Sequence, residues 1–221
     1  MELNYVITII NRNKGEDFVS LCMAREMPVV WTMLGRGTAT KNLLELYGLE
    51  ATEKSVVITI ANAEKTKDLI LEVRKKFYID IPGNGIMLSI PIKSVGGGKT
   101  LAFLSDNANL EKSCPHVTFE HELIIAIANE GHTEQVMDAA REAGATGGTV
   151  IHAKGTGAKK AEKFYGVSLV NQKEVLLIVA GSNEKAEIIQ NIVKKAGPDS
   201  PAGAIAFSLP VSYVAGLRHL P

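Results

Sequence analysis

The chain has little charge imbalance, few cysteines, few aromatic residues and no long apolar run. Its 221 residues carry 24 Lys plus Arg against 24 Asp plus Glu, so the formal net charge is zero. Proteins that bind a phosphate backbone normally carry a basic excess, because counterion release drives that binding. The balanced charge therefore argues against DNA, RNA or an anionic membrane surface as the main partner.

Cysteine usage and the N-terminal sequence indicate an intracellular protein. Cys22 and Cys114 lie far apart, show no metal-ligand spacing, and belong to a chain that is too long to need a disulfide for folding. The N-terminal residues contain no basic segment followed by an apolar stretch and a cleavage site, and no apolar run reaches the ~18 residues that span a bilayer. We therefore expect a soluble, cytoplasmic protein with reduced thiols.

What the chain does have is glycine, 20 residues in all, and an internal repeat. When residues 122–217 are laid over residues 5–98, the same local patterns coincide. The apolar, β-branched segments at 5–11 and 55–61 correspond to 122–129 and 174–180, and all four are typical of buried strands. Both copies close with a strand that contains a proline, which predicts an edge strand or a break in pairing at Pro91 and Pro210.

Each copy has the order β-α-β-β-α-β, the split βαβ arrangement of a ferredoxin-like sheet with two helices on one face. We predict an α+β fold with two tandem ferredoxin-like units, residues 1–98 and 121–221, joined by a connector at residues 99–120. The strands are apolar at nearly every position, which predicts sheets buried on both faces. That pattern favours an oligomer, in which units or chains cover one another.

Motifs for catalysis or metal binding are not convincing in this sequence. The run at residues 96–100 ends like a phosphate loop, but Lys93 stands where that loop needs its first glycine. The five histidines lack zinc-ligand spacing, and no nucleophile motif is found. Glu120 and Glu122 are interpreted as boundary charges. We predict no enzyme activity, no metal site and no required cofactor.

Glycine turns recur in both copies after a predicted strand. They are Gly35-Arg36-Gly37-Thr38 in the first copy and Lys154-Gly155-Thr156-Gly157 in the second. Each combines backbone amides, a hydroxyl and a cation, the elements of an anion-binding nest. The structural alternative is a tight turn in which glycine supplies a positive φ. The sequence leaves both interpretations open.

The second copy contains AREAGATGGTVIHAKGTG, EKFYG, KEVLLIVA and SPAGAIAFSLPVSYVAGL, and with these segments it resembles the P-II nitrogen-regulatory family. The resemblance extends more weakly over the first copy, which suggests a tandem P-II-like protein. It implies a trimer that holds a small effector, typically an adenine nucleotide, in clefts between units. It also implies that a long loop docks on a regulated transporter, enzyme or regulator, so that function is a shift in conformational population.

The resemblance further implies which residues bind the ligand. In the second copy they are Lys154, Gly155, Thr156, Gly157, Gly197, Gly203 and Arg218, and in the first copy Gly35, Gly37, Thr38 and Lys99. Ala204 and Gly216 stand where the family has cations, which favours a less charged ligand, such as a mononucleotide, or none. Neither Tyr47 nor Tyr165 aligns with the tyrosine that some family members modify, so we expect no nucleotidylation.

Two alternative functions remain open at this point. One is a structural trimer that has kept the fold and lost the ligand, which the substitutions at Ala204 and Gly216 favour. The other is a metal-ion-responsive trimer like the divalent-cation-tolerance proteins, which share the architecture. Scattered histidines argue against the second alternative.

Overall fold

A computed structural model describes residues 3–38, 53–92, 104, 119–154, 163–164, 167–168 and 172–217. The chain packs into two units, of which unit 1 contains Met1–Leu34, Leu44–His121 and Pro210–Pro221. Unit 2 contains Gly35–Leu43 and Glu122–Leu209. Each unit thus takes a segment from the other half of the sequence, and the units differ in this respect from the contiguous ranges predicted above.

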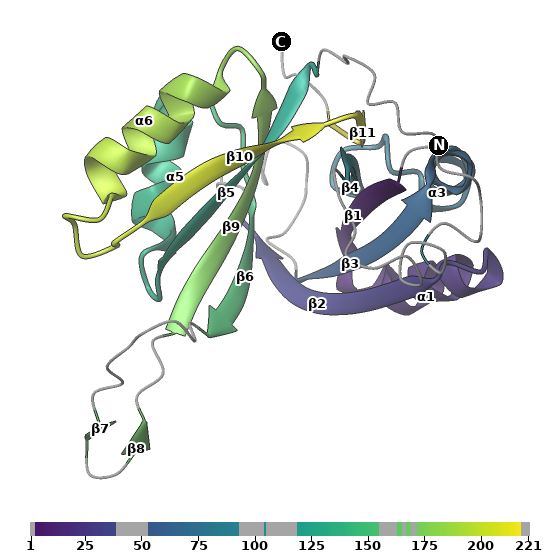
Figure 1. The fold of residues 1–221 in the computed structure, drawn as a ribbon, viewed down its shortest axis with the longest axis horizontal. Helices are drawn as coiled ribbons and strands as arrows, with labels where there is room; N and C mark the ends of the chain where they lie inside the picture. The colour runs from purple at the N-terminus through teal and green to yellow at the C-terminus, as the bar shows by residue number, and fades with distance from the viewer. Residues whose placement is uncertain are drawn as a thin grey trace. The chain divides into compact units, whose positions relative to one another are not determined.

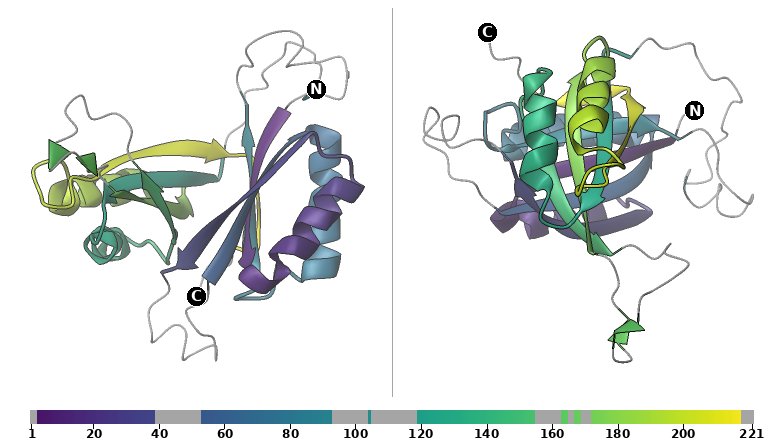
Figure 2. Two further views of the ribbon diagram at one scale, coloured as in Figure 1. Left: turned by 90° about the horizontal axis from the view of Figure 1, so that it is seen from below. Right: turned by 90° about the vertical axis from the view of Figure 1, so that its left-hand side faces the viewer.

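Unit 1 is a sheet with two helices on one face (Figures 1 and 2). Its elements are β1 (Leu3–Asn11), the short 3-10 helix η1 (Arg12–Lys14), α1 (Gly15–Ala24), β2 (Val29–Gly37), β3 (Glu53–Asn62), α3 (Ala63–Phe77), β4 (Gly85–Pro91) and β11 (Tyr213–Ala215). The strand order is β2-β3-β1-β4-β11, and β1 pairs antiparallel with both β3 and β4. The C-terminal strand β11 pairs antiparallel with β4.

Unit 2 has the same plan, again with its helices on one face of the sheet (Figure 2). Its elements are β5 (His121–Asn129), α5 (Thr133–Glu142), β6 (Thr149–Lys154), β9 (Gln172–Gly181), α6 (Lys185–Ala196) and β10 (Ile205–Val211), with the small hairpin β7 (Lys163–Phe164) and β8 (Val167–Ser168) between β6 and β9. The strand order is β10-β5-β9-β6. The last three residues of β2 pair with β6 at its outer side.

The predicted β-α-β-β-α-β order is therefore observed in each half of the chain, as expected for a mixed α/β fold of the ferredoxin-like kind. Both proline predictions are confirmed. Pro210 lies in β10, the outermost described strand of the unit 2 sheet, and Pro91 ends β4 beyond the residues that pair with β11. None of the helices in the described part of the chain is long and apolar enough to cross a membrane.

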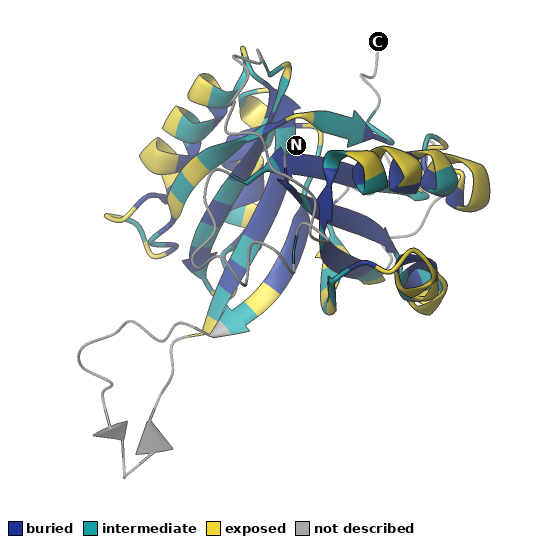
Figure 3. Ribbon diagram, turned by 45° about the vertical axis from the view of Figure 1, so that its right-hand side comes forward, coloured by how far each residue is buried: buried dark blue, intermediate teal, exposed yellow. Residues whose placement is uncertain are grey.

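The cores lie between each sheet and its helices, and they appear as buried inner faces in Figure 3. In β1, Val6 and Ile10 belong to the helix-side core of unit 1, while Ile7 and Ile9 on the opposite face are also buried. Burial on both faces, as predicted, thus holds for this strand. On β10 of unit 2 the pattern differs, because Ile205 is 53% exposed and Phe207 is 43% exposed.

Candidate functional site

The base of the long loop in unit 2 is marked by a lysine held by an asparagine. β6 ends at Lys154 and β9 begins at Gln172, so the loop spans residues 155–171. Where the chain enters β9 after this loop, the Nζ of Lys173 donates a hydrogen bond to Oδ1 of Asn129 at 2.5 Å. The Asn129 side chain also donates to the carbonyl of Pro201 at 2.9 Å. One asparagine therefore joins the loop base to the segment that precedes β10.

Unit 1 repeats this arrangement at the equivalent place. Lys54 lies opposite Asn11 in the β1–β3 ladder, and its Nζ donates to Oδ1 of Asn11 at 2.6 Å. Burial lowers the pKa of Lys54 from its ordinary value. An ammonium has three donors, and the amide oxygen is a neutral acceptor that uses one of them. Each lysine is therefore suited to bind an anion at the loop base.

Sequence reasoning missed these two lysines. The available signal was that an asparagine ends the first strand of both copies and a lysine is the second residue of the third strand in both. Neither residue is unusual by itself, and only the cross-strand pairing brings them together.

The glycine turn predicted in the first copy is wrong. Gly35 and Gly37 lie within β2, paired with Ile151 and Thr149 of β6, and neither has a positive φ. Pairing with β6 extends the strand through the predicted turn. The buried Thr38 hydroxyl donates to the Gly148 carbonyl at 2.9 Å and accepts from the Gly148 amide at 2.8 Å. These two hydrogen bonds link the residue after β2 to the residue before β6.

Most of the predicted second-copy site falls outside the described residues. Lys154 ends β6, and the structure describes its backbone only. Gly155, Thr156, Gly157 and Arg218 lie outside the described residues, as does Lys99 of the first copy. Their ligand-binding roles remain predictions.

Gly197 and Gly203 flank the loop before β10 and have backbone roles there. Gly197 caps α6, and its amide donates to the Val193 carbonyl at 3.1 Å. Gly203 has φ +53°, and its amide donates to the carbonyl oxygen of Ser200 at 3.0 Å. Ala204 is fully buried in the helix-side core. A lysine at position 204 would have its charge buried in this core.

The backbone at Gly216 also restricts which side chains can occupy this position. Its φ is +81°, and a Cβ at this position would lie 2.4 Å from the Gly85 carbonyl oxygen and 2.7 Å from that of Ile79. Real Cβ atoms do not approach backbone oxygens so closely. An arginine at position 216 is therefore incompatible with this backbone path, whatever the ligand.

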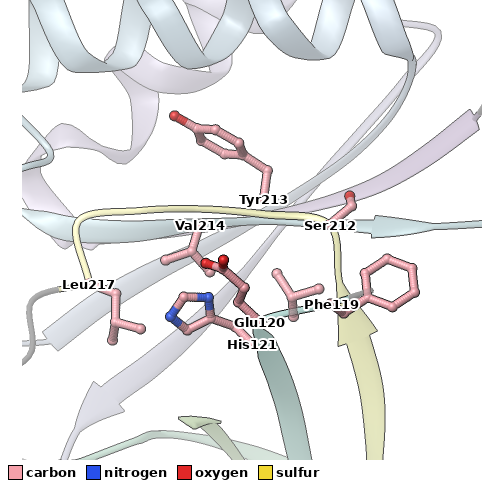
Figure 4. A pocket seen from close by; sticks show the side chains of 8 residues that line it. Phe119, Glu120, His121, Ser212, Tyr213, Val214 and Leu217 are labelled. Atoms are coloured by element: carbon pink, nitrogen blue, oxygen red, sulfur yellow. The ribbon is translucent and has the colours of Figure 1, made fainter. Parts of the chain in front are cut away.

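Unit 1 also contains a cavity of about 490 Å³ beside β11. Its wall includes His121 and Glu120, the latter interpreted above as a boundary charge. Figure 4 shows the Glu120 carboxylate close to the His121 ring, with Leu217 on one side and Phe119 on the other. The first strand of the second copy thus begins in the wall of a cavity.

No metal centre is evident in the described ranges. Within them, no group of three or more His, Cys, Asp or Glu side chains is placed to hold a metal ion.

Comparison with known proteins relates the second copy to one family. Residues 121–220 match the model of the family described as nitrogen regulatory protein P-II. Among solved structures, one that is similar is Arabidopsis thaliana PII bound to citrate, with 22% identity over 43% of this chain and 78% of that chain, and a TM-score of 0.34. No curated protein matches the chain. The C-terminal copy therefore has the sequence features of a P-II protein.

Proposed function

We propose that the chain is a P-II-like signal-transduction protein that binds a small anionic effector and regulates a partner protein. The observation that supports this proposal most directly is the match of residues 121–220 to the P-II model. Proteins of that family are regulators, and the proposal accordingly assigns no catalytic step. An adenine nucleotide is the first effector to test, nitrogen metabolism is the proposed setting, and a cytoplasmic trimer is the proposed assembly.

The lysines at the loop bases support an anionic effector. Lys54 and Lys173 each present a partly buried ammonium that is fixed by an asparagine oxygen. A charge-assisted hydrogen bond from such a group to a phosphate or carboxylate is stronger than one between neutral groups. The asparagine partner orients each lysine without neutralising it.

The loop between the second and third strands is where binding would produce a signal. In unit 2, Lys173 is the second residue of β9, directly after the loop at residues 155–171. A ligand that binds this lysine more tightly in one loop conformation shifts the loop population by that difference in affinity. The partner protein would then read the loop conformation.

Isothermal titration calorimetry of the full chain against ATP, ADP, AMP, cyclic AMP and 2-oxoglutarate tests the proposal. We expect saturable binding of at least one of them. Lys173→Gln and Arg218→Ala should each weaken it by about 1–3 kcal/mol, the range for a charge-assisted hydrogen bond. Lys67→Gln, an exposed lysine on α3, is the matched control and should leave binding unchanged. The proposal would be contradicted if none of the five compounds binds. It would also be contradicted if Lys67→Gln and Lys173→Gln had equal effects on binding.

A further inference from the structure

We propose that Asn129 couples the loop base of unit 2 to the turn before β10, residues 197–204, so that a ligand held at Lys173 also changes the stability of that turn. The inference rests on the effector function proposed above and adds a positioning residue to it, one that acts through its neighbours. The turn contains Gly197 and Gly203, both of which were predicted to bind the effector.

Asn129 bonds to two segments that are distant from it in sequence. Its Oδ1 accepts from Nζ of Lys173 at 2.5 Å, 44 positions away, and its Nδ2 donates to the carbonyl oxygen of Pro201 at 2.9 Å, 72 positions away. Its backbone amide donates to the carbonyl oxygen of Ala202 at 2.8 Å. The last residue of β5 therefore contacts both the strand that follows the long loop and the turn before β10.

The two side-chain bonds of Asn129 depend on each other. An ammonium only donates and a carbonyl oxygen only accepts, so a single orientation of the amide satisfies both partners. In the reversed orientation, Nδ2 would face the ammonium of Lys173 and Oδ1 would face the Pro201 carbonyl, and both bonds would be lost. The lysine thus selects the amide orientation that also holds the turn. A ligand that moves or fixes the ammonium changes the strength of the second bond.

Gly203 lies against the Asn129 amide and leaves room for it. A Cβ on Gly203 would be 3.1 Å from Nδ2 of Asn129, which is tighter than most Cβ contacts. Next to this contact, the Gly203 amide donates to the carbonyl oxygen of Ser200 at 3.0 Å, and the Ala204 amide donates to that of Ala196 at 2.8 Å. A change in the position of Asn129 should therefore alter the protection of these two amides.

Hydrogen exchange, measured by NMR on the full chain without ligand, tests the coupling. The reporters are the amides of Gly203 and Ala204. Asn129→Leu and Lys173→Met should each speed the exchange of both amides at least about fivefold relative to amides in the middle of β9, the size of change that follows from losing one hydrogen bond.

A double-mutant cycle shows whether Lys173 acts through Asn129. In the part of the chain that the structure describes, the Lys173 side chain bonds to Asn129, so its loss should reach the turn by this route. Adding Lys173→Met to Asn129→Leu should then speed the exchange no further. The proposal is overturned if Lys173→Met leaves the exchange of Gly203 unchanged, or if the two substitutions act independently.

Asn191→Leu is the matched control within unit 2. The Nδ2 of Asn191 also donates to a carbonyl oxygen, that of Ala139 at 2.6 Å, but this bond joins α6 to α5. Its loss should leave the exchange of the turn unchanged relative to β9. An equal effect of Asn191→Leu and Asn129→Leu would mean that the turn responds to any loss of stability in the unit, which would also overturn the proposal.

Calorimetric titration with the five compounds named above connects the coupling to the effector. Asn129→Asp keeps an oxygen acceptor but cannot donate to Pro201, and its carboxylate neutralises the Lys173 ammonium. We expect it to weaken every anion that the wild-type chain binds at least about tenfold, while Asn191→Leu leaves binding unchanged. Unchanged binding by Asn129→Asp would overturn the role of Asn129 at the effector site. Failure of the wild-type chain to bind any of the five compounds would contradict the function proposed above, and the exchange measurement would still decide whether the coupling exists.

Discussion

The two units repeat one order of elements but fill their cores with different side chains. In unit 1, Phe18 on α1 meets Phe77 on α3 edge to face, with ring centroids 5.5 Å apart. The fourth residue of the corresponding helix in unit 2 is Val136, and the core around it is mostly alanine. Small side chains let α5 and α6 pack closely together. The same order of helices and strands is thus compatible with two different sets of core side chains, provided that each set fills the space between the sheet and its helices.

The contact between the first helix and the third strand also differs. In unit 1, Gly15 lies against Ser55, and a Cβ on the glycine would be 2.4 Å from the serine oxygen. In unit 2 the corresponding contact is a hydrogen bond of 2.7 Å from Thr133 to the buried carboxylate of Glu174. The lysine–asparagine pair next to each contact is the same in both units. The units therefore differ in how they pack and agree at the loop base.

The largest expected effect comes from removing the aromatic pair. Phe18→Ala should lower the free energy of unfolding by about 3–5 kcal/mol, because the ring is fully buried and leaves a cavity. Val136→Ala, its counterpart in unit 2, should cost only about 1–2 kcal/mol, since it deletes fewer buried methyl groups. Urea denaturation measures both values. Equal losses would mean that the two cores respond alike to the loss of a buried side chain, which would contradict the difference in packing between the units.

A smaller loss of stability should follow from replacing Gly216, a glycine that the two units do not share. Gly216→Ala should lower the free energy of unfolding by about 2–4 kcal/mol, because it adds a steric clash to an unfavourable positive φ. Gly144 in unit 2 also has a positive φ, +98°, but a Cβ there meets nothing within 4 Å. Gly144→Ala should therefore cost about 1–2 kcal/mol. Thermal unfolding of the two variants gives the ranking, and the reverse order would contradict the described path of the chain at Gly216.

The smallest effect concerns reactivity rather than stability. Burial raises the pKa of the Cys22 thiol to about 12. Since the thiolate is the nucleophile, Cys22 should resist iodoacetamide at pH 8 in a folded Cys114→Ser chain and react once urea unfolds it. The equivalent residue in unit 2 is Ala140, which is also fully buried. A thiol introduced there by Ala140→Cys should be equally protected, and mass spectrometry showing rapid alkylation of either folded chain would contradict this equivalence.

The order of elements could be predicted from the sequence because it depends on local patterns. The β-branched runs that end at Asn11 and Asn129 form strands, and the apolar spacing after Asn62 forms α3. The exchange of segments between units could not be predicted in this way. Pairing of β11 with β4, and of the end of β2 with β6, is a choice among distant partners that no short window of sequence reveals.

The candidate site was predictable only in part, for the same reason. Lys54 and Lys173 could have been found by comparing the two copies, because each is the second residue of a corresponding strand. The cavity at Glu120 and His121 could not, since β11 forms part of its wall only by pairing with β4. Gly35 and Gly37 were mistaken for turn residues because a glycine in a paired strand looks the same in sequence as one in a loop.

The C-terminal strand β11 also affects the time at which unit 1 can finish folding. Ser212 bonds to Ser89 across 123 positions of sequence, so the edge of β4 lacks this partner until Ser212 has been synthesised. Contacts so distant in sequence form late and slow the overall folding rate. Unit 1, whose first strand β1 precedes every strand of unit 2 in the sequence, is therefore the unit whose sheet is completed later.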